Sequence, residues 1–416
     1  MTLREEITML CNNAKGAAAM LALADTETKN RVLSRLAQIL KENTERLILA
    51  NREDLEEAKE NGVSNAMQDR LSLTPTRIEG ICNSLESLIR LEDPVGKGEN
   101  WTRPSGLTIS RVRVPLGVVA MIYEARPNVT IDSAALCLKT GNAVILRGGK
   151  EAIHTNMALV SCIKQALNDC DLDPHAVELI ESTDRESAQI LMTMRGYVDV
   201  LIPRGGKGLI RSVVENATVP VIETGAGNCH LFVDEHADLD MALKIAVNAK
   251  CSRPSVCNAV ETILVHASVA AKFLPMLNEK LQEFAVEIRG CAKTRVLIPT
   301  ATEATEEDYS TEYNDYIVTV KVVDGLSEAI RHINRYSTGH SEAIVTENEV
   351  NAERFLREIN SAAVYVNAST RFTDGGEFGF GAEIGISTQK LHVRGPMGLP
   401  ALTTEKYLIR GNGAVR

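Results

Sequence analysis

Residues 118–150 read VVAMIYEARPNVTIDSAALCLKTGNAVILRGGK, and this stretch decides the fold class. It opens with a run of β-branched and other apolar residues at 118–123 and closes with a second run at 142–146. Between the two runs, apolar residues recur at helical spacing over about residues 128–140. Strand, helix and strand in this order are typical of a βαβ unit with a right-handed crossover. The stretch therefore predicts a parallel sheet covered by helices.

The same alternation continues on both sides of this unit. Near it, the pattern predicts strands at 107–114, 198–202 and, more weakly, 219–222, and helices at 151–169, 184–195 and 206–216. A second alternation predicts strands at 231–233, 259–265, 317–323, 343–345 and 363–367, and helices at 238–250, 267–284, 325–335 and 349–359. We therefore expect two α/β domains, each with a parallel sheet, and the cleft between them as the default binding site.

The first hundred residues and the tail have a different character. Helical periodicity predicts helices around residues 7–21, 32–40 and 78–89, with Thr74 or Thr76 as the cap of the third. The tail from Arg371 is rich in glycine and then shows no helical period.

Composition excludes several functional classes. The chain has 416 residues, 44% hydrophobic and 24% charged, as expected for an ordinary soluble globular protein. Its 45 basic and 55 acidic side chains give a formal charge of −10, which argues against general nucleic-acid binding. The N-terminus lacks the pattern of a signal peptide, and the apolar run at 114–123 is too short to span a membrane. We expect a cytoplasmic protein that binds neither membranes nor nucleic acids, and that gathers cations locally if its ligands are anionic.

Nine cysteines are scattered along the chain, and no two of them are spaced as Cys-x-x-Cys. This pattern predicts neither a disulfide framework nor a metal site, and most of the thiols should be small buried hydrophobic groups. Cys257 differs from the others because it lies in the run Arg253-Pro254-Ser255-Val256-Cys257-Asn258, between a cation and the start of a strand. It is therefore a candidate activated nucleophile.

Three further motifs follow predicted strands. Asn128, in the run Tyr123-Glu124-Ala125-Arg126-Pro127-Asn128-Val129-Thr130, could donate to a developing oxyanion or simply cap the next helix. The turns Arg147-Gly148-Gly149-Lys150 and Pro203-Arg204-Gly205-Gly206-Lys207-Gly208 combine glycines with cations, as anion sites do. A solvated turn is the alternative for the first of them. The chain contains no complete P-loop or dinucleotide fingerprint, so an ordinary Rossmann dehydrogenase is not supported.

These elements, in this order, resemble the aldehyde dehydrogenase superfamily. Glu223-Thr224-Gly225 resembles its Glu-Leu-Gly-Gly motif, and Cys257 follows Glu223 by 34 residues, a spacing typical of that superfamily. Within it, the run from Val323 to Ile344 is similar to the diagnostic pattern of the γ-glutamyl phosphate reductase family. Residues 364–376 and 387–392 agree with that family as well, so that the likeness runs essentially end to end.

The resemblance implies an aldehyde-dehydrogenase-like fold and a specific reaction. Members of this family use NADPH to reduce γ-glutamyl 5-phosphate to glutamate 5-semialdehyde and phosphate through a cysteine thioester, the second step of proline biosynthesis. The implied organisation is a cofactor-binding domain at 1–225, a catalytic domain at 226–392 and an oligomerisation tail at 393–416. A flap strand at about 103–114 and the tail would build a homo-oligomer, a dimer or tetramer. Whether the chain also contacts glutamate 5-kinase, which supplies the unstable substrate, stays open.

The resemblance also assigns roles to individual residues. The catalytic residues would be Cys257, as the nucleophile, and Asn128, as an oxyanion donor. The cofactor contacts would be Arg147, Gly148, Gly149, Lys150, Gly205, Gly206, Glu223 and Glu312. The substrate contacts would be Arg253, Ser369, Thr370 and Arg371. No metal ion is implied.

Some of these roles leave alternatives open. A strong base beside a thioester would waste it by hydrolysis, so we interpret Glu223 as a structural or cofactor-side residue. Arg253 could lower the pKa of the Cys257 thiol, meet the leaving phosphate, or form a salt bridge on a helix. We expect His332 and His340 to be structural. For the whole chain, the alternatives are an aldehyde dehydrogenase that oxidises a free aldehyde and a non-catalytic NADP-binding protein that kept the fold.

Overall fold

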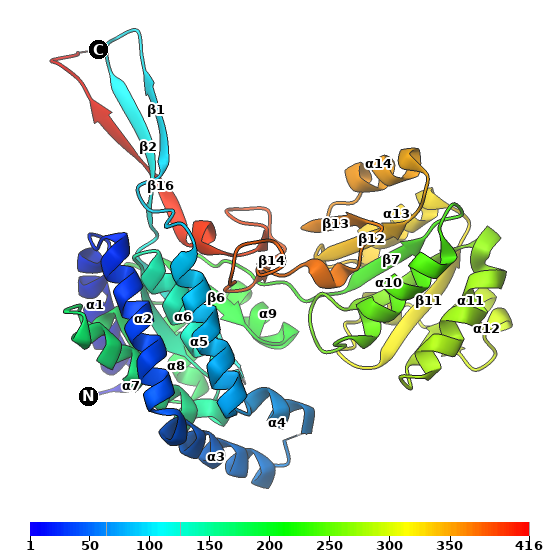
Figure 1. Cartoon of the computed structure of the whole chain (residues 1–416), viewed down its shortest axis with the longest axis horizontal. Coiled ribbons are helices and arrows are strands. Elements are labelled where there is room, and N and C mark those ends of the chain that lie inside the picture. Colours follow the sequence, from blue (N-terminus) through cyan, green and yellow to red (C-terminus); the bar gives the residue numbers. More distant parts are fainter. Residues whose placement is uncertain (64, 125, 416) are drawn as a thin grey trace. The chain divides into compact units, whose positions relative to one another are not determined.

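The computed structural model describes residues 1–63, 65–124 and 126–415. Ala125 in the first motif and Arg416 at the end of the tail therefore lie outside the described residues. The chain forms two compact units (Figure 1). Unit 1 consists of Met1–Thr224, Gly379–Gly385 and Met397–Arg416, and unit 2 of Gly225–Phe378 and Ile386–Pro396. The Gly-rich tail thus contributes to both units instead of forming a separate segment.

Unit 1 is built around a four-stranded parallel sheet with the strand order β5-β4-β3-β6. The strands are β3 (Val118–Tyr123), β4 (Ala143–Arg147), β5 (Val177–Leu179) and β6 (Val200–Arg204). Every residue of β3 is buried, as expected for a central strand that is covered on both faces. The predicted βαβ unit is confirmed, because β3 and β4 pair in parallel on either side of a helix.

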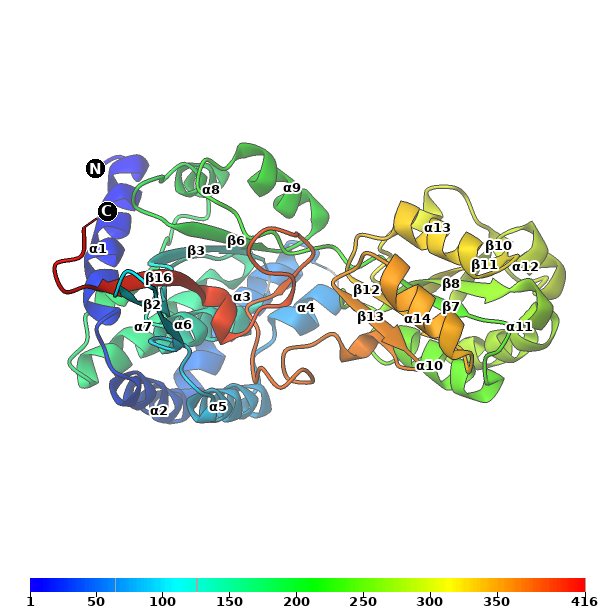
Figure 2. The same ribbon diagram turned by 90° about the horizontal axis from the view of Figure 1, so that it is seen from above.

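Helices cover both faces of this sheet (Figure 2). Buried side chains of α1, α8 and α9 pack on one face. On the other face α6 and α7 contact the strands, and α2, α3 and α5 pack against this pair. The helices of the unit are α1 (Leu3–Leu21), α2 (Thr26–Glu42), α3 (Thr44–Glu60), α4 (Asn65–Leu71), α5 (Pro75–Arg90), α6 (Pro127–Lys139), α7 (Ile153–Asp169), α8 (Arg185–Met192) and α9 (Lys207–Asn216). The hydroxyl of Thr74 accepts from the backbone N–H of Arg77 at 3.2 Å, which confirms Thr74 as the cap of α5.

A three-stranded antiparallel sheet projects from unit 1 (Figure 1). It consists of β1 (Gly98–Thr102), β2 (Thr108–Pro115) and β16 (Thr403–Arg410), in the order β1-β2-β16. The central strand β2 confirms the strand predicted at 107–114. The other two strands, β1 and β16, were not predicted. Their residues are almost all exposed, so their sequences show no alternation of apolar and polar residues.

Unit 2 contains a seven-stranded parallel sheet with the strand order β10-β9-β11-β8-β7-β12-β13. The strands are β7 (Cys229–Val233), β8 (Val260–His266), β9 (Glu287–Gly290), β10 (Thr302–Glu303), β11 (Ile317–Val323), β12 (Ser341–Val345) and β13 (Ala363–Val366). Side chains of α10 (Leu239–Cys251) and α11 (Ala267–Gln282) pack on one face, next to the short α12 (Ala292–Leu297). Side chains of α13 (Leu326–Tyr336) and α14 (Glu349–Glu358) pack on the other. A short hairpin of β14 (Ile386–Ser387) and β15 (Gly395–Pro396) completes the unit. Two parallel-sheet α/β units were predicted, and this prediction is confirmed.

The prediction of a strand at 219–222 is wrong. This segment makes only an isolated bridge, between Val221 and Leu201 of β6. In the described part of the chain, no helix combines the length and the apolar character that a membrane crossing requires. Six of the nine cysteines are buried, in agreement with their predicted role as core residues; these are Cys11, Cys82, Cys137, Cys162, Cys229 and Cys251.

A buried ion pair joins α10 to β8 in unit 2. Nζ of Lys250 lies 2.5 Å from Oε2 of Glu261, and both side chains are completely buried. Burial raises the pKa of Glu261 to about 8, and the Lys250 ammonium opposes this rise. The two residues lie close to the two ends of the segment 252–259 that carries the candidate nucleophile, because α10 ends just before that segment and β8 begins just after it.

We predict that Lys250→Met destabilises the protein by about 1–3 kcal/mol at pH 7, because the buried Glu261 carboxyl group, protonated by virtue of its raised pKa, loses its hydrogen-bond partner. The double variant Lys250→Met/Glu261→Leu should recover most of this loss. Urea unfolding followed by circular dichroism measures both. Lys280→Met is the matched control, since Lys280 pairs with Glu283 on the exposed surface, where a pair contributes about 0–1 kcal/mol. Equal losses for Lys250→Met and Lys280→Met would contradict the prediction.

Candidate active site

Three of the predicted motifs meet at one edge of the sheet in unit 1. Asn128 follows β3, Gly148 follows β4 and Gly205 follows β6, and these three strands are neighbours. Ile122 pairs with Arg147, and Tyr123 with Arg204, so the three strands end at the same level. The carboxyl edge of a parallel sheet is where α/β folds bind ligands. Parallel pairing therefore brings together the motifs that sequence separates by up to 77 residues, the distance from Asn128 to Gly205.

Asn128 does not cap α6. The helix begins with Pro127 after the N-cap residue Arg126, and no side chain makes a capping hydrogen bond there. Instead, Asn128 is exposed in the first turn, and its Nδ2 donates to Oδ2 of Asp132 at 3.0 Å. Burial raises the pKa of Asp132 to about 6, against the opposing effects of the Asn128 hydrogen bond and of Arg204. The sequence did not single out Asp132, although its spacing of four residues from Asn128 on a helix was a usable signal.

The turn after β4 leaves no room for a side chain at Gly148. A Cβ there would lie 2.3 Å from Nδ2 of Asn156 and 3.3 Å from the ring of Tyr123. Asn156 is completely buried and accepts from Thr130 at 2.7 Å, but within the described residues its Nδ2 has no hydrogen-bond partner. Only a glycine lets the backbone pass this close over the buried amide of Asn156.

The two cations of this turn have different surroundings. The guanidinium of Arg147 donates to the carbonyls of Thr183 and Asp184 at 2.7 and 3.0 Å and to the hydroxyl of Ser187 at 3.2 Å. Burial lowers its pKa. Arg147 therefore holds the loop before α8, whereas Lys150 is exposed at the start of the next helical turn.

The turn after β6 leads into α9. Gly205 and Gly206 are exposed, and Gly206 is the N-cap residue of the helix. The backbone N–H of Gly206 donates to Oε2 of Glu124 at 2.9 Å. A helix N-terminus attracts anions, and in this protein a carboxylate of the chain itself lies there.

In unit 2 the candidate nucleophile lies at the amino edge of the sheet, whereas the motifs of unit 1 lie at a carboxyl edge. Cys257 precedes β8, and Gly227 precedes the neighbouring strand β7, so both are at the amino edge of the sheet. Their backbones touch, because a Cβ on Gly227 would lie 1.5 Å from the carbonyl oxygen of Cys257. The buried thiol of Cys229 also donates to this oxygen at 3.2 Å. The backbone of Cys257 is thus fixed while its side chain stays partly exposed.

Glu312 takes part in the same arrangement. Its Oε1 accepts from the backbone N–H of Gly227 at 2.7 Å, which holds the glycine against Cys257. Gly227 was not among the predicted site residues. The close backbone contact that requires a glycine there depends on tertiary structure, so no local signal could have revealed it.

Five polar residues link the 369–373 loop to the segment 252–259 that carries Cys257. Asn258 donates to the carbonyls of Arg371 and Thr373 at 3.2 and 3.0 Å, and its own carbonyl accepts from the hydroxyl of Thr370 at 2.6 Å. The hydroxyl of Ser369 accepts from the backbone N–H of Arg371 at 3.3 Å. Both hydroxyl-bearing residues, Ser369 and Thr370, are buried, so they fold the loop rather than face solvent.

Arg371 is the partly exposed end of this network. Its guanidinium bonds to Oδ1 of Asn258 and donates to Oγ of Ser252 at 3.1 Å. Burial lowers the pKa of Arg371, and the nearby guanidinium of Arg253 lowers it further. The charge of Arg253, another predicted substrate residue, therefore acts on Arg371.

The two histidines of the diagnostic run are structural, as predicted. His332 is buried, and the centroid of its ring lies 4.9 Å from the Tyr309 ring centroid and 4.6 Å from the Tyr336 ring centroid. Burial lowers the pKa of His332 to about 2. His340 is completely buried, and its Nδ1 lies 2.8 Å from the hydroxyl of Ser341. Glu223 is partly buried beside Thr224, whose hydroxyl donates to the carbonyl of Pro203 at 2.7 Å.

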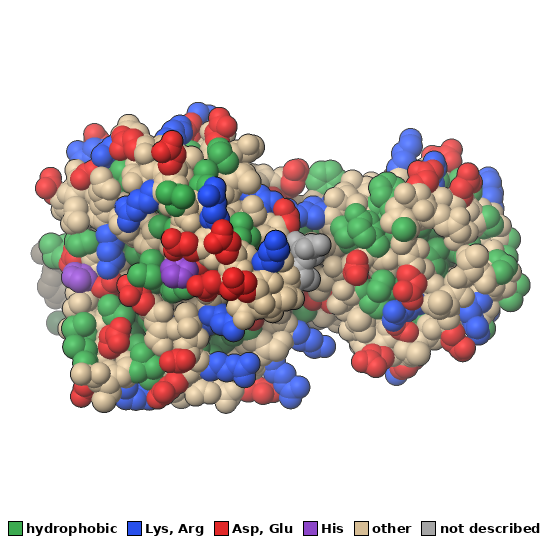
Figure 3. All heavy atoms as spheres, turned by 90° about the horizontal axis from the view of Figure 1, so that it is seen from below, with side chains coloured by type: hydrophobic (Ala, Val, Ile, Leu, Met, Phe, Trp, Pro, Cys, Tyr) green, Lys and Arg blue, Asp and Glu red, His purple; other side chains and the backbone are tan. Residues whose placement is uncertain are grey.

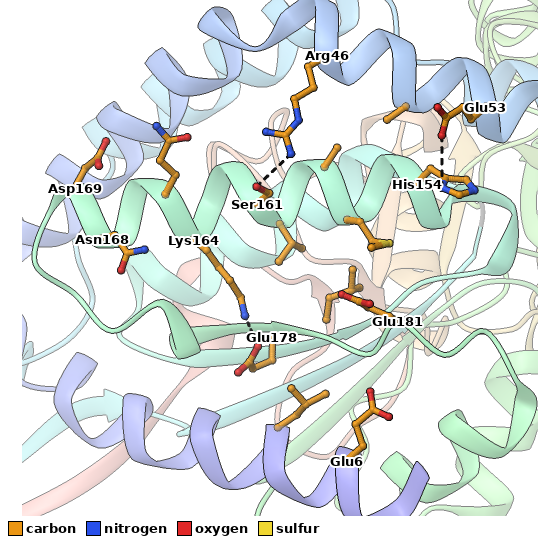
Figure 4. Close-up of a pocket in the computed structure, with 17 residues that line it drawn as sticks. Glu6, Arg46, Glu53, His154, Ser161, Lys164, Asn168, Asp169, Glu178 and Glu181 are labelled. Atoms are coloured by element: carbon orange, nitrogen blue, oxygen red, sulfur yellow. Dashed lines mark hydrogen bonds and ion pairs between the residues drawn. The ribbon is translucent and has the colours of Figure 1, made fainter. Parts of the chain in front are cut away.

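A groove of about 1000 Å³ on unit 1 lies apart from these motifs (Figure 4). It is lined by α1, α3, α7 and the end of β5, and none of the predicted site residues lines it. Its polar groups bind one another: Lys164 lies 2.5 Å from Glu178, and Arg46 donates to Ser161 at 3.5 Å. On the face of unit 1 drawn in Figure 3, acidic and basic side chains are interspersed. We therefore assign the chemistry to the strand-end motifs and not to the groove.

Comparison with known proteins agrees with this arrangement. The model of the aldehyde dehydrogenase family matches residues 2–308 and 290–383. The γ-glutamyl phosphate reductase of Carboxydothermus hydrogenoformans is 58% identical over 413 residues, which cover 99% of this chain and 100% of the relative. That of Clostridium acetobutylicum is 54% identical over 417 residues, with complete coverage of both chains.

Solved structures give the same result. The crystal structure of γ-glutamyl phosphate reductase from Thermotoga maritima has a TM-score of 0.95 at 50% identity, over 98% of this chain and 99% of that one. An acetylating aldehyde dehydrogenase from Geobacillus thermoglucosidasius shares the fold, with a TM-score of 0.73 at 16% identity over 100% of this chain and 98% of that one. The chain is therefore an oxidoreductase that belongs to the γ-glutamyl phosphate reductases of the aldehyde dehydrogenase family.

Proposed function

We propose that the protein reduces γ-glutamyl 5-phosphate to glutamate 5-semialdehyde and phosphate, with NADPH as the hydride donor, through a thioester on Cys257. The observation that carries this proposal is the partly exposed thiol of Cys257 on a backbone fixed by its contact with Gly227. The relatives named for this reaction support the choice of substrate. The proposal places the reaction in proline biosynthesis.

The proposed reaction requires a nucleophile, but it does not require a strong general acid to protonate the leaving group. Phosphate is a good leaving group, so the thiolate of Cys257 can attack the acyl carbon, form the carbon–sulfur bond and expel phosphate. The thioester then accepts a hydride at the same carbon and becomes a thiohemiacetal on Cys257. Its collapse breaks the carbon–sulfur bond and releases the aldehyde and the thiolate.

Asn128 and the backbone N–H of Cys257 would stabilise the oxyanion that forms in both steps. The amide of Asn128 has two N–H groups, and Asp132 accepts only one of them. The second remains for a ligand. We interpret Glu223 as a residue of the cofactor side rather than a base, because a base that activates water would hydrolyse the thioester.

Arg253 and Arg371 would hold the anionic groups of the substrate, its phosphate and its α-carboxylate. Two guanidinium groups held close together repel each other, and an anion between them removes the repulsion. Ser369 and Thr370 would contribute by holding the loop that presents Arg371.

The turns of unit 1 fit the nicotinamide cofactor, which supplies a hydride when bound. Gly148 passes close over the buried amide of Asn156, and Gly149 over the carboxylate of Glu151, while the exposed Lys150 suits a 2′-phosphate. Gly205 and Gly206 would take the pyrophosphate at the start of α9. Glu312 belongs to the proposed cofactor set by its resemblance to the family and also fixes Gly227.

We further propose that the sheet β1-β2-β16 mediates a dimer or tetramer. Trp101, Tyr407 and Ile409 on this sheet are exposed apolar side chains, and its outer strands β1 and β16 each pair on one side only within the described residues. Such edges favour pairing with another chain.

A phosphate-dependent assay in the reverse direction tests the proposed reaction. With glutamate 5-semialdehyde and NADP⁺, we expect NADPH to form only when inorganic phosphate is present, since phosphate must displace the thiolate from the thioester. NADPH formation at the same rate without phosphate would support the oxidative aldehyde dehydrogenase instead.

Cys257→Ser should fold normally and lose about 10³-fold or more of kcat, because a hydroxyl is a poor nucleophile without a base. The matched control is Cys291→Ser. Cys291 is partly exposed, and hydrogen bonds from Thr294 and Val322 outweigh burial and lower its pKa, so it is the competing reactive thiol. Loss of activity in Cys291→Ser but not in Cys257→Ser would refute the assignment.

Asn128→Ala should lower kcat by about 10²-fold, the effect of one lost oxyanion donor. The midpoint of thermal unfolding should stay unchanged, because Asn128 does not cap α6. An effect on stability or KM alone, with kcat preserved, would remove Asn128 from the oxyanion site.

Lys150→Glu should weaken NADPH binding far more than NADH binding, by an amount that shrinks at high salt, because only NADPH carries the 2′-phosphate. Dissociation constants of both cofactors measure this. Lys207→Glu is the control, since Lys207 is exposed at the start of α9 and would affect the pyrophosphate that both cofactors share. Equal changes for both cofactors in Lys150→Glu would place Lys150 outside the 2′-phosphate site.

A further inference from the structure

The carboxylate of Glu124 occupies the N-terminus of α9. The backbone N–H of Gly206, the N-cap residue, donates to Oε2 of Glu124 at 2.9 Å. None of the helix's own side chains caps this end. The first amides of a helix have no partner within the helix, so an anion here has both a hydrogen-bond donor and the favourable end of the helix dipole.

The backbone pairing of β3 with β6 places the exposed residue Glu124 beside the start of α9. The backbone N–H of Glu124 donates to the carbonyl of Arg204 at 3.0 Å, which extends the pairing of β3 with β6 by one residue. Glu124 therefore stands directly beside Gly205. A Cβ on Gly205 would lie 2.5 Å from Oε2 and 2.7 Å from Cδ of Glu124, so only a glycine admits the carboxylate.

The same amide is the one that the proposed function gives to the cofactor's pyrophosphate. A carboxylate and a pyrophosphate cannot accept from one N–H at the same place, and two anions repel each other. We propose that Glu124 competes with the pyrophosphate for the N-terminus of α9: it stabilises this helix in the cofactor-free protein and is displaced when the cofactor binds. This inference rests on the proposed cofactor site.

Competition has two consequences of opposite sign. Removing the carboxylate should leave the amide of Gly206 available, and cofactor binding should become tighter. The cofactor-free protein should become less stable, because its helix loses an anion at the N-terminus. An ordinary helix cap would give only the second effect.

The test compares Glu124→Gln and Glu124→Ala with the wild type. Calorimetric titration should show NADP⁺ binding about fivefold tighter in Glu124→Ala, the factor that corresponds to about 1 kcal/mol at a helix N-terminus. The gain should be smaller in Glu124→Gln, whose amide oxygen can still accept from Gly206. Adenosine 2′-monophosphate lacks a pyrophosphate, so its dissociation constant should not change. Thermal unfolding of the cofactor-free variants should occur at a lower temperature than that of the wild type.

Glu215→Gln is the matched control for net charge. Glu215 lies near the other end of α9, where it is exposed and pairs with Arg211, and its loss should leave both dissociation constants unchanged. Unchanged or weaker NADP⁺ binding in the Glu124 variants, while the wild type binds NADP⁺, would overturn the competition and leave Glu124 as a helix cap. Failure of the wild type to bind NADP⁺ would overturn the proposed cofactor and this inference together.

Discussion

Parallel strand pairing is the constraint on which the arrangement of both units depends. Each large sheet is entirely parallel, so all of its strands begin at one edge and end at the other. In unit 1 the carboxyl edge collects Asn128, Gly148 and Gly206, as expected for α/β folds. In unit 2 the candidate nucleophile Cys257 lies at the amino edge, where it and Gly227 precede neighbouring strands. The thiol needs a rigid backbone, and the contact between these two residues supplies it without using any side chain.

The fold could be predicted where burial imposes a period. Strand β3 and helix α6 are buried almost throughout, and their apolar patterns identified them. The strands β5, β9 and β10 are only three, four and two residues long, too short to show a period. Helix α3 also went unnoticed, because its buried positions include the polar residues Asn51 and Asp54. Those two side chains are satisfied by long-range hydrogen bonds, such as that of Asp54 with Thr155, which no local pattern encodes.

In the candidate site, too, some features could be predicted from the sequence and others could not. Glycines at strand ends and a cysteine in a polar loop are local signals, so the motifs could be found from sequence. The hydrogen-bond partners of these residues are distant along the chain. Glu124 accepts from Gly206, and Glu312 accepts from Gly227. Arg147 donates to the loop at 183–187. For this reason the sequence could name Arg147 and Lys150 together as cofactor contacts, whereas the structure separates a supporting cation from an exposed one.

The distribution of charge explains how an acidic protein can bind anions. With a formal charge of −10, the protein's overall field repels a phosphorylated substrate, so attraction must be local. Arg371 shows how this is arranged: Asn258 and Ser252 hold its guanidinium in place, close to Arg253 and partly out of water, at a cost that appears as a lowered pKa. Side chains free to move would separate and pair with nearby carboxylates. On the proposed function, an anion bound by Arg371 and Arg253 would reduce the repulsion between the two guanidinium groups, and the hydrogen bonds of Arg371 would orient its guanidinium before the anion arrives.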